Sequence, residues 1–466
     1  MVLDEAHLHS PVMVDHDLGE ESWGAIGTVR EAKREMEFTR RQFLGASAAA
    51  VIAAGTVARG KVLGANDRIR VACVGVNGRG GSHISGFSDL AGSEVVALCD
   101  VDSNVLARRA KELEDKTGKK PKTYVDVRDL LADDTMDAVT FATPNHWHSL
   151  GTIWACRAAK DVYVEKPLSH EVWEGRQLVA AAEKYHRVVM HGTQRRSERD
   201  WARAMQRLRE GVIGEVYMAR ALCFKNRNSI GKGEPKSPPA HLNWPLWQGP
   251  AKEQPYCDLY VHYNWHWFWE YGNGDLGNQG VHQMDVAVWG MNRGLPVRVA
   301  SMGGRYGYQD QGQTANTQVC TYLYPDGTML VFEVRGRATN DEGGVKIGNL
   351  FYGSEGYMVE KKFFGKDGKE IPDEKGPGDD IQVTGNHYES FLRAVRSRKP
   401  EDNPAKPTDG HLASAHCHLG NIAYRLGGDL TFDPKAERFV GSDSRKANKL
   451  LKREAYRKGF EVPPLA

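Results

Sequence analysis

The feature that most constrains the fold is a glycine-rich loop, residues 75–81, that directly follows a buried strand. The strand-like run before it covers residues 69–74, and a helix-like segment at 83–90 comes after it. A second strand-like run at 94–99 then ends in Asp100. Strand, glycine loop, helix, strand and acid in this order are typical of a dinucleotide-binding βαβ unit.

The loop departs from the usual G-x-G-x-x-G pattern, because Asn77 takes the place of the middle glycine. Small residues let a pyrophosphate approach the N–H groups of a helix N-terminus, and Asn tolerates the left-handed backbone region better than most residues. We expect the loop to bind the cofactor through Gly75, Asn77, Gly78, Arg79 and Gly80. Asp100 would bind the ribose 2′-hydroxyl and repel a 2′-phosphate, so NAD is favoured over NADP. The alternative is that Asp100 only caps an exposed turn.

Alternation of strands and helices continues beyond this unit. Its further segments are the helices 104–116 and 127–131, the strands 122–125, 137–142 and 161–164, and a helix between the last two strands. This order predicts a parallel, doubly wound sheet whose ligands collect at the carboxyl ends of the strands. The polar clusters 75–81, 143–148 and 165–167 all fall on that edge, which makes it the best candidate site.

Four motifs together resemble the Gfo/Idh/MocA oxidoreductases, the superfamily of glucose–fructose oxidoreductase and inositol dehydrogenase. They are the glycine loop at 75–80, Thr143-Pro144-Asn145 with His148, Glu165-Lys166-Pro167, and the run from Leu276 to Asp285. The resemblance spans about residues 66–440. Within the family, the chain is most similar to the exported branch of sugar-degrading bacteria.

The resemblance implies an N-terminal Rossmann domain followed by an α+β domain with a large, mostly antiparallel sheet. The sequence agrees with this, since strand-like runs recur at 297–302, 316–324 and 328–335, with helices near 386–398 and 409–426. We therefore expect four parts of the chain. They are an N-terminal extension with a signal (1–65), a NAD-binding Rossmann domain (66–190), a substrate and oligomerisation domain (191–440) and a C-terminal tail (441–466).

The resemblance also implies roles for individual residues. Lys166 is expected to take the hydroxyl proton as hydride leaves the substrate, and His282 to act as general acid/base or to orient the hydroxyl. Glu165 would hold the lysine or the cofactor ribose. The remaining expected cofactor contacts are Thr143, Pro144, Asn145, His148 and Lys166, and the expected substrate contacts are Lys166, Arg195, Asn278, His282, Asp285 and Trp265.

Asn278 departs from the family pattern, because many relatives have Asp at this position. An amide can orient a hydroxyl but cannot take up its proton, so the base function is concentrated on Lys166 and His282. This departure leaves open whether the chain acts as a simple dehydrogenase on the usual substrates. On residue type alone, a solvated lysine and a buried core histidine are the structural alternatives for the two residues.

Five tryptophans between 244 and 269 lie among polar residues and favour a sugar ligand, since a pyranose is apolar on its faces and hydroxylated at its rim. Core packing explains most of these tryptophans equally well. In the same region, His262 and His266 have i, i+4 spacing, but no carboxylate pattern accompanies them. We therefore expect no metal site.

Charge and cysteine content exclude other classes of protein. The 62 Lys+Arg residues against 60 Asp+Glu give a net charge of +2, which argues against a protein that mainly binds nucleic acid. Seven cysteines without a C-x-x-C pair support neither a zinc ribbon nor a disulfide framework. Cys73 and Cys99 are expected to be small buried apolar residues.

The N-terminal segment resembles a twin-arginine export signal. Arg40 and Arg41 precede an uncharged stretch from Phe43 to Ala58, which is too short to span a bilayer. Translation starting at Met36 instead of Met1 would fit such a signal better. We therefore expect export to the periplasm by the twin-arginine machinery, which carries folded proteins, and a tightly bound NAD.

The combined expectation is an exported NAD-dependent oxidoreductase acting on a sugar or cyclitol carbinol. Two alternatives remain open: an NAD-dependent glycosidase with a redox-neutral oxidation–elimination cycle, and a non-catalytic sugar-binding protein. By analogy with the family, a dimer or tetramer is expected.

Overall fold

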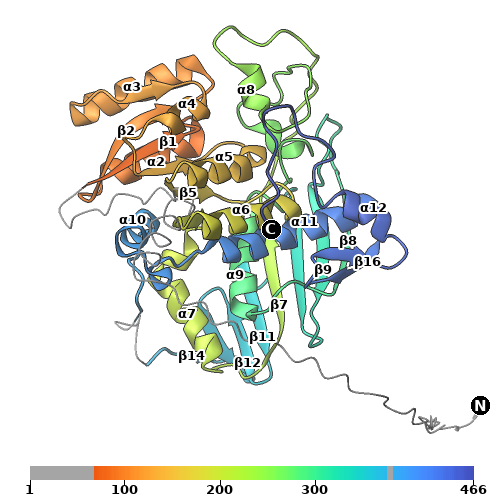
Figure 1. The fold of residues 1–466 in the computed structure, drawn as a ribbon. Helices are drawn as coiled ribbons and strands as arrows, with labels where there is room; N and C mark the ends of the chain where they lie inside the picture. Colours follow the sequence, from red (N-terminus) through yellow and green to blue (C-terminus); the bar gives the residue numbers. More distant parts are fainter. Residues whose placement is uncertain (1–67, 375–380) are drawn as a thin grey trace, which may run out of the picture. The chain divides into compact units, whose positions relative to one another are not determined.

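The structure is a computed structural model that describes residues 68–374 and 381–466. The predicted N-terminal extension with its signal (1–65) therefore lies entirely outside the described residues. The first domain is built on a six-stranded parallel sheet of order β3-β2-β1-β4-β5-β6 (Figure 1). Its strands are β1 (Ile69–Val74), β2 (Ser93–Cys99), β3 (Lys122–Tyr124), β4 (Ala138–Phe141), β5 (Asp161–Glu165) and β6 (Val189–Gly192).

Helices connect consecutive strands of this sheet. They are α2 (Gly78–Ser88), α3 (Ser103–Thr117), α4 (Val127–Ala132), α5 (Asn145–Arg157) and α6 (Val172–Lys184). Helix α2 begins at Gly78, five residues before the predicted start at 83, because the glycines of the loop form its first turn. The first N–H groups of α2 therefore lie within the predicted binding loop itself.

The second domain contains a ten-stranded sheet of order β14-β13-β12-β11-β7-β10-β9-β8-β15-β16. All neighbouring strands are antiparallel except β7 and β10, which are parallel. Its strands are β7 (Val216–Cys223), β8 (Arg298–Gly304), β9 (Thr317–Leu323), β10 (Met329–Arg335), β11 (Ile347–Gly353), β12 (Gly356–Val359), β13 (Lys362–Gly365), β14 (Glu370–Ile371), β15 (Asp429–Asp433) and β16 (Arg438–Val440). The predicted fold class, a Rossmann domain followed by a mostly antiparallel α+β domain, is confirmed.

Helices cover one face of this large sheet. The helices of the second half are η1 (Arg195–Ser197), α7 (Arg199–Arg209), α8 (Trp244–Gln248), η2 (Asn264–Trp267), α9 (Gly280–Met291), α10 (His387–Ser397), η3 (Pro400–Asp402), α11 (Pro407–Leu426) and α12 (Ser444–Lys449). The long helix α11 packs against α9 and also against α6 of the Rossmann domain (Figure 1). This packing joins the two domains through one shared helix.

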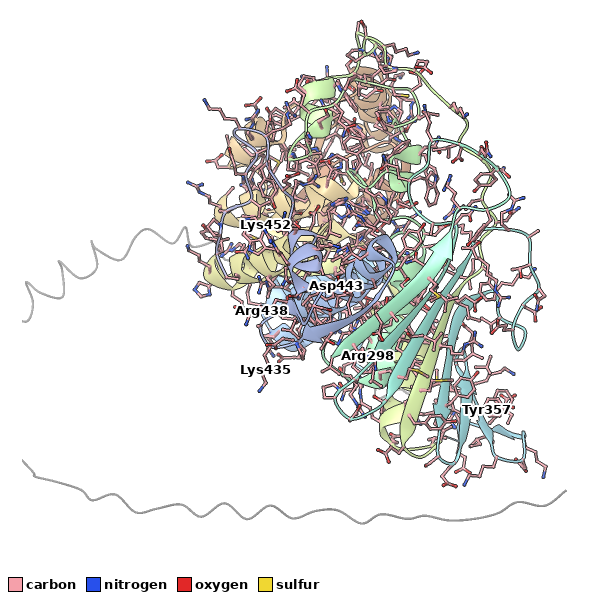
Figure 2. The ribbon with its side chains drawn as sticks, turned by 90° about the vertical axis from the view of Figure 1, so that its right-hand side faces the viewer. Arg298, Tyr357, Lys435, Arg438, Asp443 and Lys452 are labelled. Atoms are coloured by element: carbon pink, nitrogen blue, oxygen red, sulfur yellow. The ribbon has the colours of Figure 1, made fainter. Side chains whose placement is uncertain are left out.

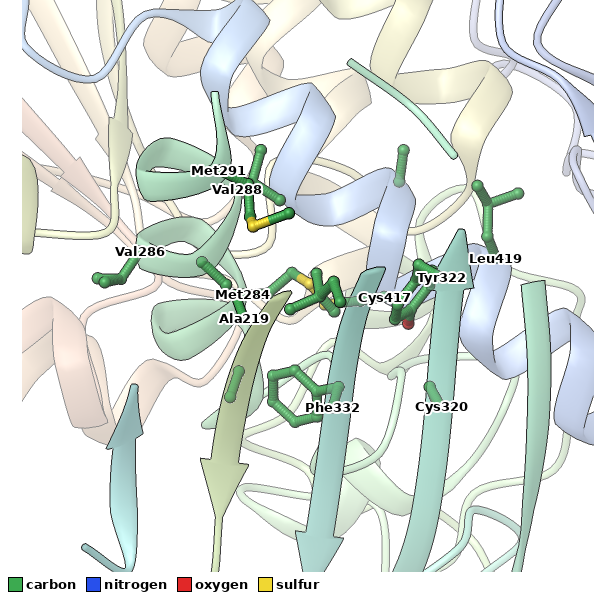
Figure 3. Close-up of a cluster of buried hydrophobic side chains, with 14 of the residues drawn as sticks. Ala219, Met284, Val286, Val288, Met291, Cys320, Tyr322, Phe332, Cys417 and Leu419 are labelled. Carbon is green, nitrogen blue, oxygen red and sulfur yellow. The ribbon is translucent and has the colours of Figure 1, made fainter. Parts of the chain in front are cut away.

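The main hydrophobic core lies between the large sheet and helices α9 and α11 (Figure 3). Phe332 of β10, Tyr322 of β9 and Met284 of α9 are fully buried in it. Gly280, at the start of α9, packs against Phe332 so closely that a Cβ would lie 2.8 Å from the ring. The core thus fixes the beginning of α9, which carries part of the candidate site.

The C-terminal residues return to the Rossmann domain. Lys452 (labelled in Figure 2) has its Nζ 3.8 Å from the centre of the Trp173 ring of α6, and Phe460 packs with Trp147 of α5. The amides of Leu465 and Ala466 donate to one oxygen of Gln177. The predicted tail therefore packs first on the second domain, through α12, and then, from Lys452 on, along the first domain.

None of the described helices has both the length and the apolar character needed to span a membrane. All seven cysteines are buried and unpaired, in agreement with the expectation of no disulfide framework.

Candidate functional site

One cavity of about 480 Å³ lies at the carboxyl ends of the parallel strands and extends to the second domain. Its wall on the Rossmann side comprises the glycine loop, Asp100 and the segments after β4 and β5. Its opposite wall comprises residues from the segment 246–282, among them Trp265, Asn278 and His282. The cavity therefore joins the predicted cofactor edge to residues of the predicted substrate domain.

The glycine loop is folded so tightly that two of its residues must be glycine. Gly75 has a φ of +77°, and a Cβ on Gly80 would lie 1.9 Å from the carbonyl oxygen of Gly75. Asn77 has a φ of −71°, so it does not use the left-handed region that its residue type tolerates. That region is used by Gly75 instead, where the chain turns from strand to loop.

The loop and Asp100 together fit a dinucleotide. No atom lies within 4 Å of the position that a Cβ of Gly78 would take, so the start of α2 is open to the cavity and can receive a pyrophosphate. The Asp100 carboxylate accepts hydrogen bonds from the amides of Val76 (2.8 Å) and Asp102 (3.0 Å). Each of its oxygens keeps a further lone pair, which can accept from a ribose hydroxyl. Burial raises the pKa of Asp100.

Glu165 belongs to a charged network around the loop. Its Oε1 accepts from Arg79 Nε (2.8 Å) and Gln194 Nε2 (3.2 Å) and lies 3.1 Å from His83 Nε2. Hydrogen bonds from His83 and Arg79 hold the pKa of Glu165 well below its usual range, although burial opposes them. Glu165 thus fixes Arg79 and the glycine loop, and it makes no hydrogen bond to Lys166 among the described residues.

Lys166 reaches across the cavity to the second domain. Its Nζ donates to the backbone oxygen of Asn278 (3.0 Å) and to its side-chain Oδ1 (2.8 Å). Burial lowers the pKa of Lys166 to about 8, with Arg79 lowering it further and Glu165 opposing the change. An amine with this pKa is partly uncharged near neutral pH, as a proton acceptor must be.

His282 lines the same cavity from the first turn of α9. Its Nδ1 lies 3.1 Å from the carbonyl oxygen of Thr193, which can only accept, so Nδ1 carries the proton. Burial lowers the pKa of His282 to about 3, and the charge of Lys166 contributes. The ring is therefore neutral, and its Nε2 presents a lone pair.

His148 connects the segments that follow β4 and β5. Its Nδ1 lies 2.6 Å from the carbonyl oxygen of Pro167, and its Nε2 lies 2.9 Å from that of Thr143. Nearby, Asn145 Nδ2 donates to Asn273 Oδ1 (3.0 Å). Thr143, Pro144, Asn145 and His148 all line the cavity, as predicted for the cofactor edge. His148 fixes the position of the Lys166–Pro167 turn relative to that edge.

Two predicted substrate contacts do not reach the cavity. Asp285 is fully buried one turn beyond His282, and both its oxygens accept from Arg196 Nε (2.9 and 3.0 Å). Arg195 lies 3.7 Å from Glu198 and over the Trp201 ring. Neither Asp285 nor Arg195 lines the cavity, and the ion pair of Asp285 has a packing function inside the second domain.

The cavity also contains residues that the sequence interpretation missed or undervalued. Trp265 lines it as predicted, together with Tyr263, His266 and Trp247 from the same region. Most of the tryptophans between 244 and 269 pack against one another, as Trp244 does on Trp247 with ring centres 4.8 Å apart. The only sequence pattern that included His266 was its i, i+4 spacing from His262, and this pattern did not predict a place in the cavity. Among residues 68–374 and 381–466, no group of three potential metal ligands is present.

Comparison with known protein families gives two matches that together cover most of the chain. Residues 69–193 match the model "Oxidoreductase family, NAD-binding Rossmann fold". Residues 223–462 match the model "Oxidoreductase family, C-terminal alpha/beta domain". The first match confirms NAD as the predicted cofactor.

A curated relative from Shewanella pealeana, named glycosyl hydrolase family 109 protein, is 31% identical over 209 residues. The match covers 40% of this chain and 46% of that relative, so less than half of its length is shared.

Among solved structures, the WlbA dehydrogenase from Bordetella pertussis, in complex with NADH and UDP-GlcNAcA, has a TM-score of 0.60 at 19% identity. The similarity covers 78% of this chain and 99% of that one. A putative myo-inositol dehydrogenase from Sinorhizobium meliloti has a TM-score of 0.52 at 18% identity, with the same coverage. These likenesses concern the fold.

Proposed function

Because the chain belongs to the Gfo/Idh/MocA oxidoreductase family and has its NAD-binding domain, we propose that it oxidises a carbinol of a sugar or cyclitol with NAD. The observation that carries this proposal is the single cavity that Lys166 and His282 share with the glycine loop and Asp100. In this arrangement a polyol fits between the two domains, next to the bound cofactor. NAD, when bound, supplies the acceptor for the hydride.

Lys166 is the proposed base. Its amine, with a pKa of about 8, takes the proton from the hydroxyl that becomes a carbonyl. The two oxygens of Asn278 hold the amine, and as an uncharged residue Asn278 does not stabilise the ammonium form as Asp would. The Asp-to-Asn difference from many relatives therefore favours a lysine that is uncharged before the reaction.

His282 is the proposed partner that orients the substrate through a neighbouring hydroxyl, since the one proton of the reacting hydroxyl goes to Lys166. Because its Nδ1–H is donated to Thr193, its Nε2 accepts a hydrogen bond from the substrate and does not act as an acid at the start of the reaction. Trp265 lies along the same cavity and offers a flat apolar surface to a sugar ring. Export by the twin-arginine route to the periplasm, with NAD retained by the folded protein, remains part of the proposal and follows from Arg40 and Arg41.

The proposal is tested on natively purified protein. Mass spectrometry of the denatured protein first identifies the co-purified dinucleotide, which we expect to be NAD. Absorbance near 340 nm is then followed after addition of hexoses and inositols. A substrate-dependent rise supports the proposal, whereas bound NAD that no polyol reduces contradicts it and favours a non-catalytic sugar-binding protein.

A second candidate function is an NAD-dependent glycosidase with an oxidation–elimination cycle. The observation that favours it is the match to relatives named glycosyl hydrolase family 109. Such an enzyme releases the aglycone from a glycoside without net reduction of NAD. Aryl glycosides distinguish the two candidates, since the glycosidase liberates the aryl alcohol with only a transient absorbance at 340 nm.

We also propose that the chain pairs through the outer face of its large sheet. Met302 and Val319 lie opposite each other on β8 and β9, and Leu323 follows on the same face. Their exposed fractions of 83%, 40% and 36% are high for apolar side chains in a sheet. Light scattering with Val319→Asp tests the pairing: a dimer or tetramer in the wild type and a monomer in the variant are expected.

A further inference from the structure

His266 is one of four histidines that line the cavity, and the proposed reaction leaves it without a function. It belongs to the short helix η2 (Asn264–Trp267) in the irregular segment between β7 and α9. Its ring lines the same cavity as Lys166 and His282, and 8% of the residue is exposed. The charge of Lys166 also contributes to lowering the pKa of His266.

The orientation of the His266 ring is fixed from several sides. It stacks on Trp265 with ring centres 3.6 Å apart and an angle of 19° between the planes. Its Nδ1 lies 2.5 Å from the carbonyl oxygen of Tyr263. Gly272 packs against its backbone so closely that a Cβ there would lie 2.6 Å from the His266 Cα. The ring is thus held rigidly before any substrate binds.

This geometry determines the charge and tautomer of the ring. A carbonyl oxygen only accepts hydrogen bonds, so the proton of His266 is on Nδ1. Burial lowers the pKa of His266 to about 3, which keeps the ring neutral. Its Nε2 forms no hydrogen bond within residues 68–374 and 381–466, and it therefore presents a free lone pair, as His282 does.

A purely structural histidine in the same region is different. His146 is fully buried, contributes nothing to the cavity wall, and directs its Nε2 to the carbonyl oxygen of Trp247 at 2.9 Å. His262 also lines the cavity, but its Nε2 donates to the Asp102 carboxylate at 3.0 Å and its side chain is 39% exposed. Of these three rings, only His266 combines a cavity position, a buried ring and an acceptor that no described residue engages.

We propose that His266 binds substrate, with its Nε2 accepting a hydrogen bond from a hydroxyl other than the one that Lys166 deprotonates and the one that His282 orients. The inference rests on the proposed oxidation of a polyol and deepens it. Two neutral imidazoles, His282 and His266, then accept from two hydroxyls of one ring. The substrate class is accordingly a polyol with neighbouring hydroxyls, and a simple secondary alcohol binds more weakly because it leaves both acceptors unpaired.

The test uses the NAD-loaded wild type, His266→Phe, His266→Gln and the control Tyr260→Phe. Tyr260 belongs to the same segment, but it packs in the aromatic cluster with Trp244 and Tyr271 and does not line the cavity. D-glucose, D-galactose, myo-inositol and scyllo-inositol are screened by absorbance at 340 nm. The best of them is then compared with its monodeoxy analogues, and cofactor affinity is measured by quenching of tryptophan fluorescence.

We expect kcat/KM of His266→Phe to fall about 10- to 100-fold, with His266→Gln retaining more activity and Tyr260→Phe unchanged. One deoxy analogue should lose a similar factor in the wild type but little more in His266→Phe, while the cofactor affinity stays within about twofold. Equal losses for every analogue in wild type and variant, or an unimpaired His266→Phe, overturn the inference. If no polyol reduces the cofactor of the wild type, the proposed function fails, and the inference falls with it.

Discussion

Two regions of the molecule bury titratable groups, and the groups differ in their partners and in whether a ligand can reach them. In the cavity, Lys166 faces an uncharged amide, Asn278, and the space for a ligand. The second region is the Arg453 cluster, in which that arginine contacts Glu171, Glu174, Glu270 and His170. None of the cluster residues lines the cavity.

The pKa shifts alone do not distinguish the two regions. Lys166 is lowered to about 8, and burial with a neighbouring Glu171 raises the pKa of Glu174 to about 8 as well. The difference is one of access and of partners: Arg453 faces carboxyl groups away from the cavity, whereas Lys166 faces a neutral amide and the space for a ligand. A shifted pKa therefore indicates a reaction site only where a ligand can reach the group.

The largest expected effect separates catalysis from stability. Lys166→Met should lower kcat/KM by about 10²- to 10⁴-fold, because it removes the base, while the melting temperature is unchanged or rises. Lys160→Met is the matched control, since Lys160 is also buried and donates to a carbonyl oxygen, that of Met136 at 2.7 Å, outside the cavity. Loss of activity in both variants would contradict the special position of Lys166.

In the Arg453 cluster we expect a substitution to lower stability and to leave activity nearly unchanged. Arg453→Met leaves Glu171, Glu174 and Glu270 without the cation that contacts them and should lower the free energy of unfolding by about 3–5 kcal/mol. Activity per folded molecule, measured well below the melting temperature, should change less than about threefold. Chemical denaturation of wild type and variant measures the first value. A variant that is stable but inactive would place the cluster in the reaction.

The two regions also differ in how far the sequence could predict them. Lys166 follows a buried strand within a short motif, so its place at the sheet edge follows from the parallel topology. Arg453 and its carboxylates come from α6, from the segment after η2 and from the C-terminal tail, and no local pattern relates them. Their contact depends on how the tail packs against α6.

Within the site, the same limit applies. His282 and Asp285 belong to one motif on one helix, but side-chain packing directs Asp285 to Arg196 and away from the cavity. His266 is fixed by the Tyr263 carbonyl and the face of the Trp265 ring. It lies in an irregular segment, where the spacing of residues does not predict which side chains share one face. Periodic patterns thus locate strand ends and helix starts, whereas contacts inside irregular segments require the folded structure.

A smaller effect concerns the pH dependence of the proposed base. The uncharged amine of Lys166 is the active form, so kcat/KM should fall about tenfold per pH unit below a midpoint near 8 and level off above it. His282, with a pKa of about 3, should add no step between pH 5 and 9. Since the charge of Lys225 lowers the pKa of Lys166, Lys225→Met should move the midpoint to higher pH. An unmoved midpoint would mean that another group is titrating.

The smallest expected effect is a pH dependence of stability that comes from Glu174 in the Arg453 cluster. The pKa of Glu174 is about 8 in the folded protein against an ordinary value of 4.5, so the folded state keeps a proton that the unfolded state has released between these values. Stability should therefore fall as pH rises from about 4.5 to 8, with a slope of up to about 1.4 kcal/mol per pH unit.

Glu174→Gln keeps an oxygen that can accept from the Tyr456 hydroxyl and removes the titration. Its unfolding free energy should vary less with pH than that of the wild type, and its kcat/KM profile should keep the wild-type midpoint. A shift of that midpoint would show that the two regions are electrostatically coupled, and the separation between a closed cluster and an open site would then no longer hold.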